Sequence, residues 1–280
     1  MSNPWAVSSL IPFLAARAAL DRVASAARPQ GRGQFSQAIP RLRAETLDLK
    51  AVLAAGKPVI IKGLAESMMP PASADLAALR SIAASSRAAF DVRLYDRAAP
   101  YFLYTGDYGQ QLRETRTMTL AEFIAAMFDE SAFAEFAVYR QFDRRAADAA
   151  MAAIIDALAR GLEARAGRPA EKNASGVWIG STGVVTPLHY DAWPGLLFQT
   201  HGSKRLLMFS PREIHRLYFL PQYAVGKRWC RLPGRSAEAD PGQFPLYGAA
   251  PRFEDTLHAG EALFVPPFWP HEIEALEPNI

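Results

Sequence analysis

Beyond Gly176 the sequence is built from short apolar runs separated by glycine and proline, and this pattern constrains the fold more than any other. The runs span residues 177–179, 196–199, 205–209 and 262–265. Apolar runs of this length between turn residues are typical of β-strands. Many short strands in series predict a β-barrel or jelly roll for this part of the chain.

Residues 1–175 carry a mixed pattern of helices and strands. Apolar spacing, a glycine stop at Gly56 and a capping box formed by Thr119 and Glu122 indicate helices. The predicted helices span residues 10–28, 46–55, 75–84, 119–128 and 146–166. The predicted strands span residues 57–63, 90–95, 101–104 and 137–142. The chain is therefore predicted to be mainly β with α additions, its α/β part coming first.

Composition places the chain among ordinary soluble globular proteins. Of its 280 residues, 50% are hydrophobic and 21% are charged, and the net charge is only +3. That excess is too small to indicate nucleic acid, so no nucleic-acid partner is expected. The densest basic stretch, residues 227–235, is interpreted as a solvated loop that faces an acidic ligand. The length suits one large domain, placed over 46–280 after a helical and loop extension over 1–45.

Cysteine content and hydropathy bear on localisation. Cys230 is the only cysteine, so no intrachain disulfide can form, as is usual in a reducing compartment. No stretch approaches the ~20 apolar residues that cross a bilayer. Residues 1–20 make a poor secretory signal. A cytoplasmic protein without a membrane partner is expected.

Residues 186–191, Thr-Pro-Leu-His-Tyr-Asp, carry the most informative chemistry. If this segment is extended, alternation places His189 and Asp191 on the same side of the backbone. One imidazole and one carboxylate then point into the same cavity. Two histidines and a carboxylate with open coordination positions are typical of non-haem Fe(II) oxygenases. We therefore expect a third ligand from another strand.

His271 is the candidate third ligand. It follows the apolar segment 264–270 and lies 80 residues after Asp191 (271 − 191), so only a fold that brings distant strands together can use both. The ordinary alternative is that His-x-Asp occurs by chance and that a histidine after a proline turn is simply packed. The remaining histidines, which lack a matched carboxylate, are His201, His215 and His258.

The surroundings of these residues resemble the JmjC/cupin-8 oxygenases, and within them the asparaginyl-hydroxylase branch. The matching motifs are residues 178–180, 183–191, 199–211 and 266–276, with weaker likeness over 58–63, 101–104 and 138–141. The resemblance implies a double-stranded β-helix, a form of jelly roll, with its core over about 137–280 and an N-terminal α/β elaboration. It also implies Fe(II) bound by His189, Asp191 and His271, with 2-oxoglutarate and O₂ as co-substrates.

The resemblance implies a co-substrate site as well. Lys204 lies fifteen positions after His189 (204 − 189) and matches the family lysine that pairs with the distal carboxylate of 2-oxoglutarate. A cation is needed there because a dianion inside an apolar barrel must not be left unpaired. Thr186 matches the hydroxyl that hydrogen-bonds the same carboxylate, and Tyr139 matches the tyrosine that joins it. Without the resemblance, Lys204 would be interpreted as a lysine in a turn, Thr186 as an ordinary strand residue and Tyr139 as an aromatic residue of the core.

The family residues that contact the substrate are matched less completely in this sequence. Tyr104 matches a family tyrosine that lines a peptide groove, Gln141 a glutamine near the target side chain, and Trp269 an aromatic beside the distal histidine. Each is as often a packing residue. Gly195 stands where asparaginyl hydroxylases have an asparagine near the co-substrate, and residues 193–194 replace polar residues beside it. The resemblance therefore does not imply that the protein hydroxylates asparagine.

The implied activity is hydroxylation of a C–H bond of a protein side chain or small metabolite, with conversion of 2-oxoglutarate into succinate and CO₂. Aspartate rather than glutamate in the triad favours hydroxylases over histone demethylases. Two alternatives stay open: a cupin enzyme that uses another divalent metal without 2-oxoglutarate, and a non-catalytic cupin-like binding module. Nine residues (272–280) follow His271, whereas the family continues into helices that dimerise, so a homodimer is left open.

Overall fold

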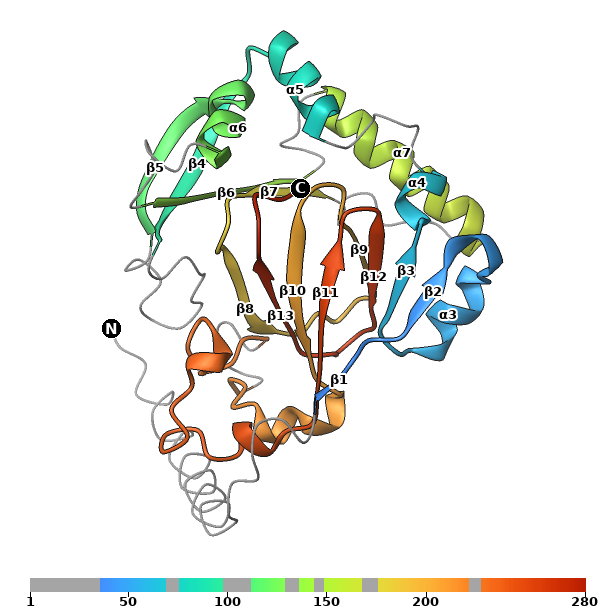
Figure 1. Cartoon of the computed structure of the whole chain (residues 1–280), viewed down its shortest axis with the longest axis vertical. Coiled ribbons are helices and arrows are strands. Elements are labelled where there is room, and N and C mark those ends of the chain that lie inside the picture. The colour runs from blue at the N-terminus through green and yellow to red at the C-terminus, as the bar shows by residue number, and fades with distance from the viewer. Residues whose placement is uncertain are drawn as a thin grey trace, which may run out of the picture.

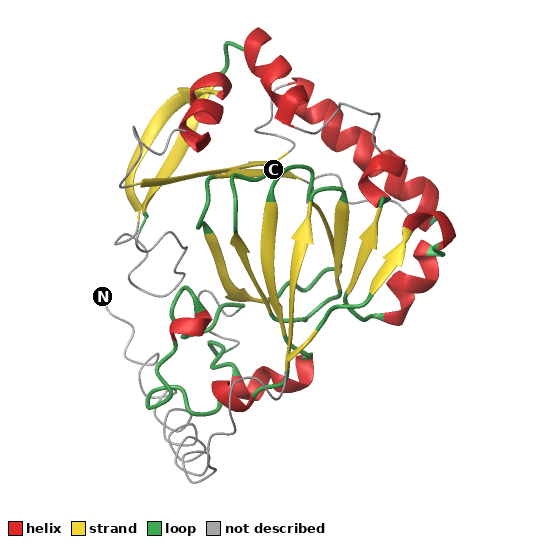
Figure 2. Ribbon diagram, in the orientation of Figure 1, coloured by secondary structure: helices red, strands yellow, loops and turns green. Residues whose placement is uncertain are grey.

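The computed structural model describes residues 36–68, 76–97, 112–128, 136–143, 149–167, 176–221 and 228–280. Two β-sheets face one another as a barrel, a third sheet lies across one end, and helices cover one side (Figures 1 and 2). The structure is mainly β with helical additions, so the predicted jelly-roll fold is confirmed. The helix predicted over 10–28 and the strand predicted over 101–104 lie outside the described residues.

The first barrel sheet has the strand order β1-β11-β10-β13-β8. Its strands are β1 (Ser36–Gln37), β11 (Arg252–His258), β10 (Ser203–Met208), β13 (His271–Ala275) and β8 (Val185–His189). All pair antiparallel except β1, which joins the edge in parallel. Because β13 pairs with both β8 and β10, a segment from the end of this sequence lies inside the sheet.

The second barrel sheet has the order β2-β3-β12-β9. Its strands are β2 (Arg41–Arg43), β3 (Val59–Lys62), β12 (Glu261–Val265) and β9 (Gly195–Phe198). Strands β1, β2 and β3 thus extend both sheets with residues from before position 63. The expected start of the β core near residue 137 is therefore too late, and residues 36–43 of the predicted extension belong to the sheets.

The inner faces of the two sheets form an apolar core. Leu206 and Met208 of β10 point into it, whereas Leu207 lies between them in sequence and packs on the outside. Since side chains alternate along a strand, Lys204 shares the inner face with Leu206 and Met208. The other buried members of this inner core are Ile39, Ile60, Leu257, Leu263 and Val265.

A long connection, residues 209–251, joins β10 to β11 and extends below the barrel in Figure 1. Its described parts contain the 3₁₀ helices Pro211–Arg216, Ser236–Glu238 and Tyr247–Ala249. Buried side chains of this connection pack against Leu188 and Leu207 on the outside of the first sheet. The connection therefore lies at the end of the barrel where β8 ends and β13 begins.

The third sheet has the order β5-β4-β6-β7 and packs against helices α5 and α6. Its elements are α5 (Leu76–Ser85), β4 (Ala89–Asp96), β5 (Leu112–Thr119), α6 (Leu120–Phe128), β6 (Phe136–Asp143) and β7 (Gly176–Gly180). The capping box is confirmed, because Thr119 N–H donates to the Glu122 carboxylate at 2.7 Å and Glu122 N–H donates to the Thr119 hydroxyl at 3.3 Å. Strands β6 and β7 cross the barrel end opposite the 209–251 connection (Figure 1).

Helices α3 (Leu49–Ala55), α4 (Leu64–Met68) and α7 (Ala149–Ala166) cover the outer face of the second sheet, together with the 3₁₀ helix Ala44–Thr46. Helix α3 ends as predicted at Gly56, whose φ of 61° is the left-handed conformation that favours glycine. Within the described ranges, no helix is both long and apolar enough to cross a bilayer.

The residues after β13 hold this strand in place. Asn279 pairs with Gly180 of β7 as an isolated bridge, and its side-chain amide donates to the Gly180 carbonyl at 3.1 Å. Ile280 N–H donates to the His201 carbonyl at 3.1 Å. These contacts after His271 anchor its strand to the third sheet and to the start of β10.

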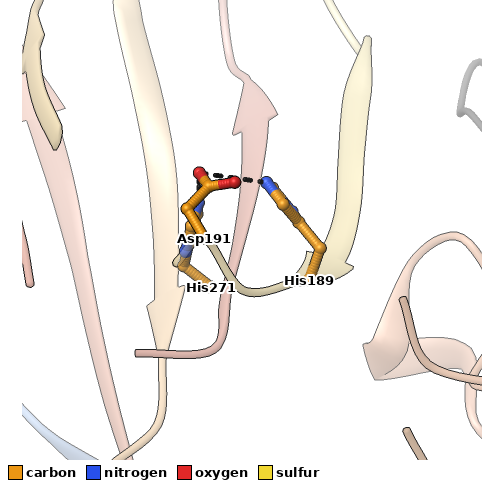
Figure 3. A group of neighbouring side chains, drawn as sticks. All are labelled: His189, Asp191 and His271. Atoms are coloured by element: carbon orange, nitrogen blue, oxygen red, sulfur yellow. Dashed lines mark ion pairs between the residues drawn. The ribbon is translucent and has the colours of Figure 1, made fainter. Parts of the chain in front are cut away.

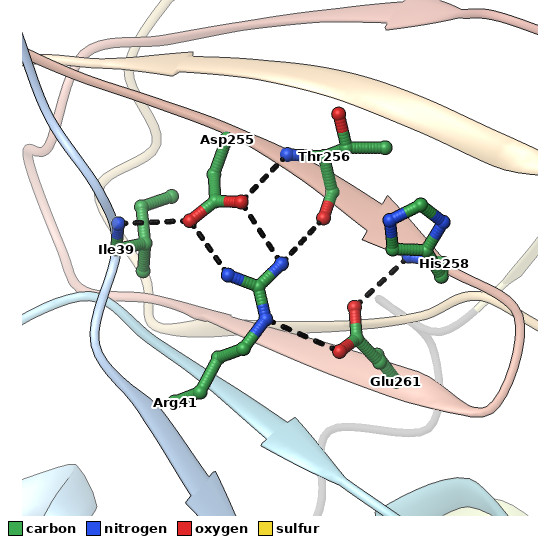
Figure 4. Close-up of polar contacts among 6 residues, drawn as sticks. All are labelled: Ile39, Arg41, Asp255, Thr256, His258 and Glu261. Atoms are coloured by element: carbon green, nitrogen blue, oxygen red, sulfur yellow. Dashed lines mark hydrogen bonds and ion pairs between the residues drawn. The ribbon is translucent and has the colours of Figure 1, made fainter.

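Arg41 links the N-terminal strands to the β11–β12 hairpin (Figure 4). Its guanidinium donates to both oxygens of Asp255, at 2.8 and 2.9 Å, to the Thr256 carbonyl at 2.8 Å and to Glu261 at 3.3 Å. The side chains of Asp255 and Glu261 are only 12% and 9% exposed. Burial raises the pKa of Asp255, but its hydrogen bonds to Arg41, Thr256 and Ile39 outweigh that effect and hold the pKa below its usual value.

We expect Arg41→Met to destabilise the protein, because it leaves two largely buried carboxylates without their cation. The loss should be about 2 kcal/mol, less than for a fully buried pair because Arg41 is partly exposed. Urea unfolding near neutral pH measures it. Arg43→Met, an exposed arginine on the same strand, is the matched control, and an equal loss in both variants would contradict a specific role of the Arg41 network.

Candidate metal centre

The pairing of β13 with β8 brings two histidines from distant parts of the chain together. His271, the first residue of β13, lies directly opposite His189, the last residue of β8. Their ring centroids are 4.2 Å apart with an interplanar angle of 54°. Strand β8 ends and β13 begins at the barrel end beside the 209–251 connection (Figure 1). The fold therefore positions two imidazoles side by side at one mouth of the barrel.

Asp191 completes the group (Figure 3). Its Oδ2 atom lies 3.9 Å from His189 Nε2 and 4.0 Å from His271 Nε2. One ligand atom from each of the three residues lies within 4.8 Å of the other two. Asp191 follows the end of β8 and is 46% exposed at its side chain, so the group opens toward solvent on the carboxylate side. The structure thus brings together the three predicted metal ligands.

Backbone carbonyls select the tautomer of both imidazoles. His189 Nδ1 lies 2.8 Å from the Pro187 carbonyl oxygen, and His271 Nδ1 lies 2.9 Å from the Trp269 carbonyl oxygen. A carbonyl only accepts hydrogen bonds, so each Nδ1 carries the proton and each Nε2 presents a lone pair. This arrangement, with the outer nitrogen fixed by a carbonyl and the inner nitrogen free, is usual for metal-binding histidines.

Burial keeps both imidazoles neutral. Removal from solvent lowers the pKa of His189 well below its usual value, and the neighbouring His271 lowers it further. Burial also lowers the pKa of His271. Two neutral nitrogens and one carboxylate oxygen then converge at distances too long for hydrogen bonds. A divalent cation fits this donor set, because three lone-pair donors that face one another are otherwise left uncompensated.

A β-bulge adds Thr186 to the same inner face. His189 pairs with His271, but Thr186 pairs with Ile273, so three steps along β8 match two steps along β13. Simple alternation would have placed Thr186 and His189 on opposite faces. Ile273 packs in the inner core, so its partner Thr186 also faces the barrel interior, next to the histidine pair.

Lys204 is a buried lysine at the other end of the same inner sheet face. It is 7% exposed and pairs with Ala275, four residues after His271 on β13, which is roughly 13 Å along a strand. Burial lowers the pKa of Lys204 to about 8. Within the described ranges, no side chain forms an ion pair or hydrogen bond with its ammonium group. The inner face therefore has an uncompensated cation facing the core.

The other predicted site residues are placed less closely around the triad. Tyr139 of β6 packs against Val184 and Ala275, at the Lys204 end of the barrel. Trp269 packs against the inner core beside Phe253, with ring centroids 5.8 Å apart, and its carbonyl orients His271. Gln141 is exposed on β6, opposite Trp178. Tyr104 lies outside the described residues.

Two residues at the triad were not predicted as part of the site. Arg228 Nη1 donates to Asp191 Oδ1 at 3.1 Å, and the Trp229 ring stacks on His189 with centroids 4.5 Å apart and an interplanar angle of 18°. The interpretation of residues 227–235 as a solvated loop therefore needs correction. The Arg228 and Arg231 side chains are exposed as expected, but Cys230 is buried and packs on the barrel. No local sequence pattern marked Arg228 or Trp229, because their contacts with Asp191 and His189 arise from tertiary packing.

The fold and the triad define a class that sequence comparison also identifies. Residues 44–280 match the Cupin-like domain family. The chain belongs to this family, and its relatives place it in the JmjC group of cupin-like proteins.

Over the aligned region, individual relatives are about one-third identical in sequence to this chain. Jumonji C domain-containing protein 5 of Drosophila melanogaster is 33% identical over 107 residues, covering 36% of this chain and 25% of that protein. Human tRNA wybutosine-synthesizing protein 5 is 35% identical over 101 residues, covering 34% and 28%. Human HSPB1-associated protein 1 is 36% identical over 107 residues, covering 37% and 21%. The matched region thus spans about a quarter of these relatives.

We expect protons to compete with metal at this site only at unusually low pH. Two histidines with ordinary pKa values would cost about ten-fold in affinity between pH ~7.5 and ~6.0. Because burial lowers the pKa of both His189 and His271, the loss here should be clearly smaller than that. Mn(II) titrations at the two pH values measure it. A ten-fold loss would show that both imidazoles titrate in the usual range.

Proposed function

We propose that this protein is an Fe(II)- and 2-oxoglutarate-dependent oxygenase that hydroxylates a C–H bond. The observation that carries the proposal is the pairing of two features on one barrel face. His189, Asp191 and His271 converge at one end, and the uncompensated cation of Lys204 is buried at the other. Members of the JmjC group are typically oxygenases of this kind, which agrees with the family of this chain.

The ligand residues would hold Fe(II) through His189 Nε2, His271 Nε2 and Asp191 Oδ2. The bound iron would supply the activation of O₂ that couples oxidation of 2-oxoglutarate to oxidation of the substrate. The carbonyls of Pro187 and Trp269 keep the Nδ1 protons in place, so both imidazoles remain neutral donors. Iron in its ferrous state also fits the reducing cytoplasm, where we expect the protein to act.

Lys204 and Thr186 would bind the distal carboxylate of 2-oxoglutarate. The Lys204 ammonium lies in apolar surroundings where a counter-charge is strongly favoured, and the Thr186 side chain faces the same interior. Leu206 and Ile273, which are strand partners, would form the apolar floor beneath the co-substrate. Tyr139, near Ala275, would add its hydroxyl.

The substrate is proposed to be a protein side chain or a small molecule. The name of one relative, HSPB1-associated protein 1, refers to association with a protein, and that of another refers to tRNA wybutosine synthesis. Trp269 is proposed to lie along the substrate's path because it adjoins His271. Gln141 is exposed on β6, which crosses the other end of the barrel, and is proposed only as a contact for substrate parts remote from the triad. The Asp191 side of the triad is open to solvent, which suits entry from this mouth of the barrel.

The direct test is anaerobic addition of Fe(II) and then 2-oxoglutarate to the metal-free protein. We expect a visible charge-transfer band with 2-oxoglutarate, and succinate formation once O₂ is admitted. His189→Ala should abolish both signals. Lys204→Met should keep metal binding but weaken 2-oxoglutarate binding at least about 100-fold, because a buried dianion loses its cation. A wild-type protein that binds metal yet gives neither band nor succinate would contradict the proposal.

The pH dependence of co-substrate binding should follow Lys204. Burial lowers its pKa to about 8 in the protein without 2-oxoglutarate, so above that pH the amine must take up a proton before it can pair with a carboxylate. Affinity for 2-oxoglutarate should be level below pH ~8 and fall about ten-fold per pH unit above it. Lys204→Arg, which stays charged, should remove this dependence. A flat profile in the wild type up to pH ~10 would contradict it.

A further inference from the structure

Of the three triad residues, Asp191 has the side chain that the barrel strands constrain least. Strand β8 ends at His189, so no ladder fixes the carboxylate. The Asp191 backbone is held, since its carbonyl accepts the Phe268 N–H at 2.7 Å. Its side chain is 46% exposed, in contrast to 12% for His189 and 6% for His271. A half-exposed carboxylate rotates freely unless another group restrains it.

Arg228 supplies that restraint. Among the described residues, it is the one whose side chain hydrogen-bonds the Asp191 carboxylate, from Nη1 to Oδ1 at 3.1 Å. The other oxygen, Oδ2, is the one that faces both histidine Nε2 atoms. The hydrogen bond therefore decides which oxygen is turned toward the centre of the triad.

The segment that carries Arg228 is itself fixed to the end of β8. Tyr190 N–H donates to the Arg228 carbonyl at 3.1 Å, and Trp229 forms an isolated bridge with His189. The Trp229 indole lies almost parallel to the His189 ring. Two neighbouring residues of the 209–251 connection thus contact two ligands of the triad, one through a hydrogen bond and the other through stacking.

We propose that Arg228 is a positioning residue that holds the Asp191 carboxylate so that Oδ2 alone is presented to the metal. The inference rests on the metal site of the proposed function and assigns to it a residue from outside the barrel strands. Arg228 acts through Asp191 and does not itself bind the metal. The connection between β10 and β11 thereby contributes to the metal centre as well as to the outer packing of the barrel.

Two effects of Arg228 oppose each other, and their sizes decide the expected result. Its positive charge disfavours a nearby cation, but the guanidinium is 49% exposed, so solvent and salt screen that repulsion to well under ten-fold in affinity. Loss of an outer partner that orients a metal ligand typically weakens metal binding about 10- to 100-fold. Removal of Arg228 should therefore weaken binding.

The test measures Mn(II) affinity of the full chain by electron paramagnetic resonance, together with the melting temperature of the metal-free protein. Arg228→Met should weaken Mn(II) binding about ten-fold, and Arg228→Lys, which keeps a charged donor, should recover most of that loss. Arg231→Met is the matched control, because it removes an exposed charge from the same segment, where Arg231 lies over the Tyr218 ring. The metal-free melting temperature should be unchanged, since exposed ion pairs contribute little to stability.

The outcomes separate this inference from the proposed function. If wild-type protein binds no Mn(II), the metal site fails and the role of Arg228 fails with it. If wild-type protein binds Mn(II) and Arg228→Met binds equally well or more tightly, the positioning role is overturned while the metal site stands. An equal loss in Arg228→Met and Arg231→Met would also overturn it, because the effect would then be one of net charge.

Discussion

The antiparallel pairing of β13 with β8 is the contact on which the candidate site depends. It places His271 opposite His189 and, through a bulge, Ile273 opposite Thr186. The bulge turns both Thr186 and His189 toward the barrel interior, which regular alternation does not allow. A slip of one residue in this register would face one histidine outward, so the same pairing positions both the candidate metal ligands and Thr186, which is proposed to bind the co-substrate.

The barrel separates two kinds of polar group along one apolar interior. At the mouth beside the 209–251 connection, the Nε2 atoms of two buried imidazoles converge with one oxygen of the half-exposed Asp191 carboxylate. At the opposite end, Lys204 offers a positive charge that lacks an anion among the described residues. Buried polar groups without partners are costly, and a metal with a dicarboxylate would satisfy both ends at once.

Local patterns in the sequence were sufficient for much of the fold and for the pairing of His189 with Asp191 as candidate ligands, whereas His271 lies 80 residues further on and no local pattern links it to them. The Thr119 capping box, the Gly56 stop and the His189-x-Asp191 spacing depend on residues close in sequence, so they could be predicted. Strand β5 was missed because polar residues occupy most of its positions, and β1 and β2 because two- and three-residue strands leave no periodicity. Arg228 could not be assigned to the site because its contact with Asp191 is set by tertiary packing alone.

The most direct test of the central claim is a crystal structure of the protein grown anaerobically with Mn(II) and 2-oxoglutarate. Anomalous scattering locates the metal without reference to activity. We expect one strong peak bonded by His189 Nε2, His271 Nε2 and Asp191 Oδ2, with the distal carboxylate of 2-oxoglutarate against Lys204. A metal bound elsewhere, or a co-substrate that leaves Lys204 without a carboxylate, would contradict it.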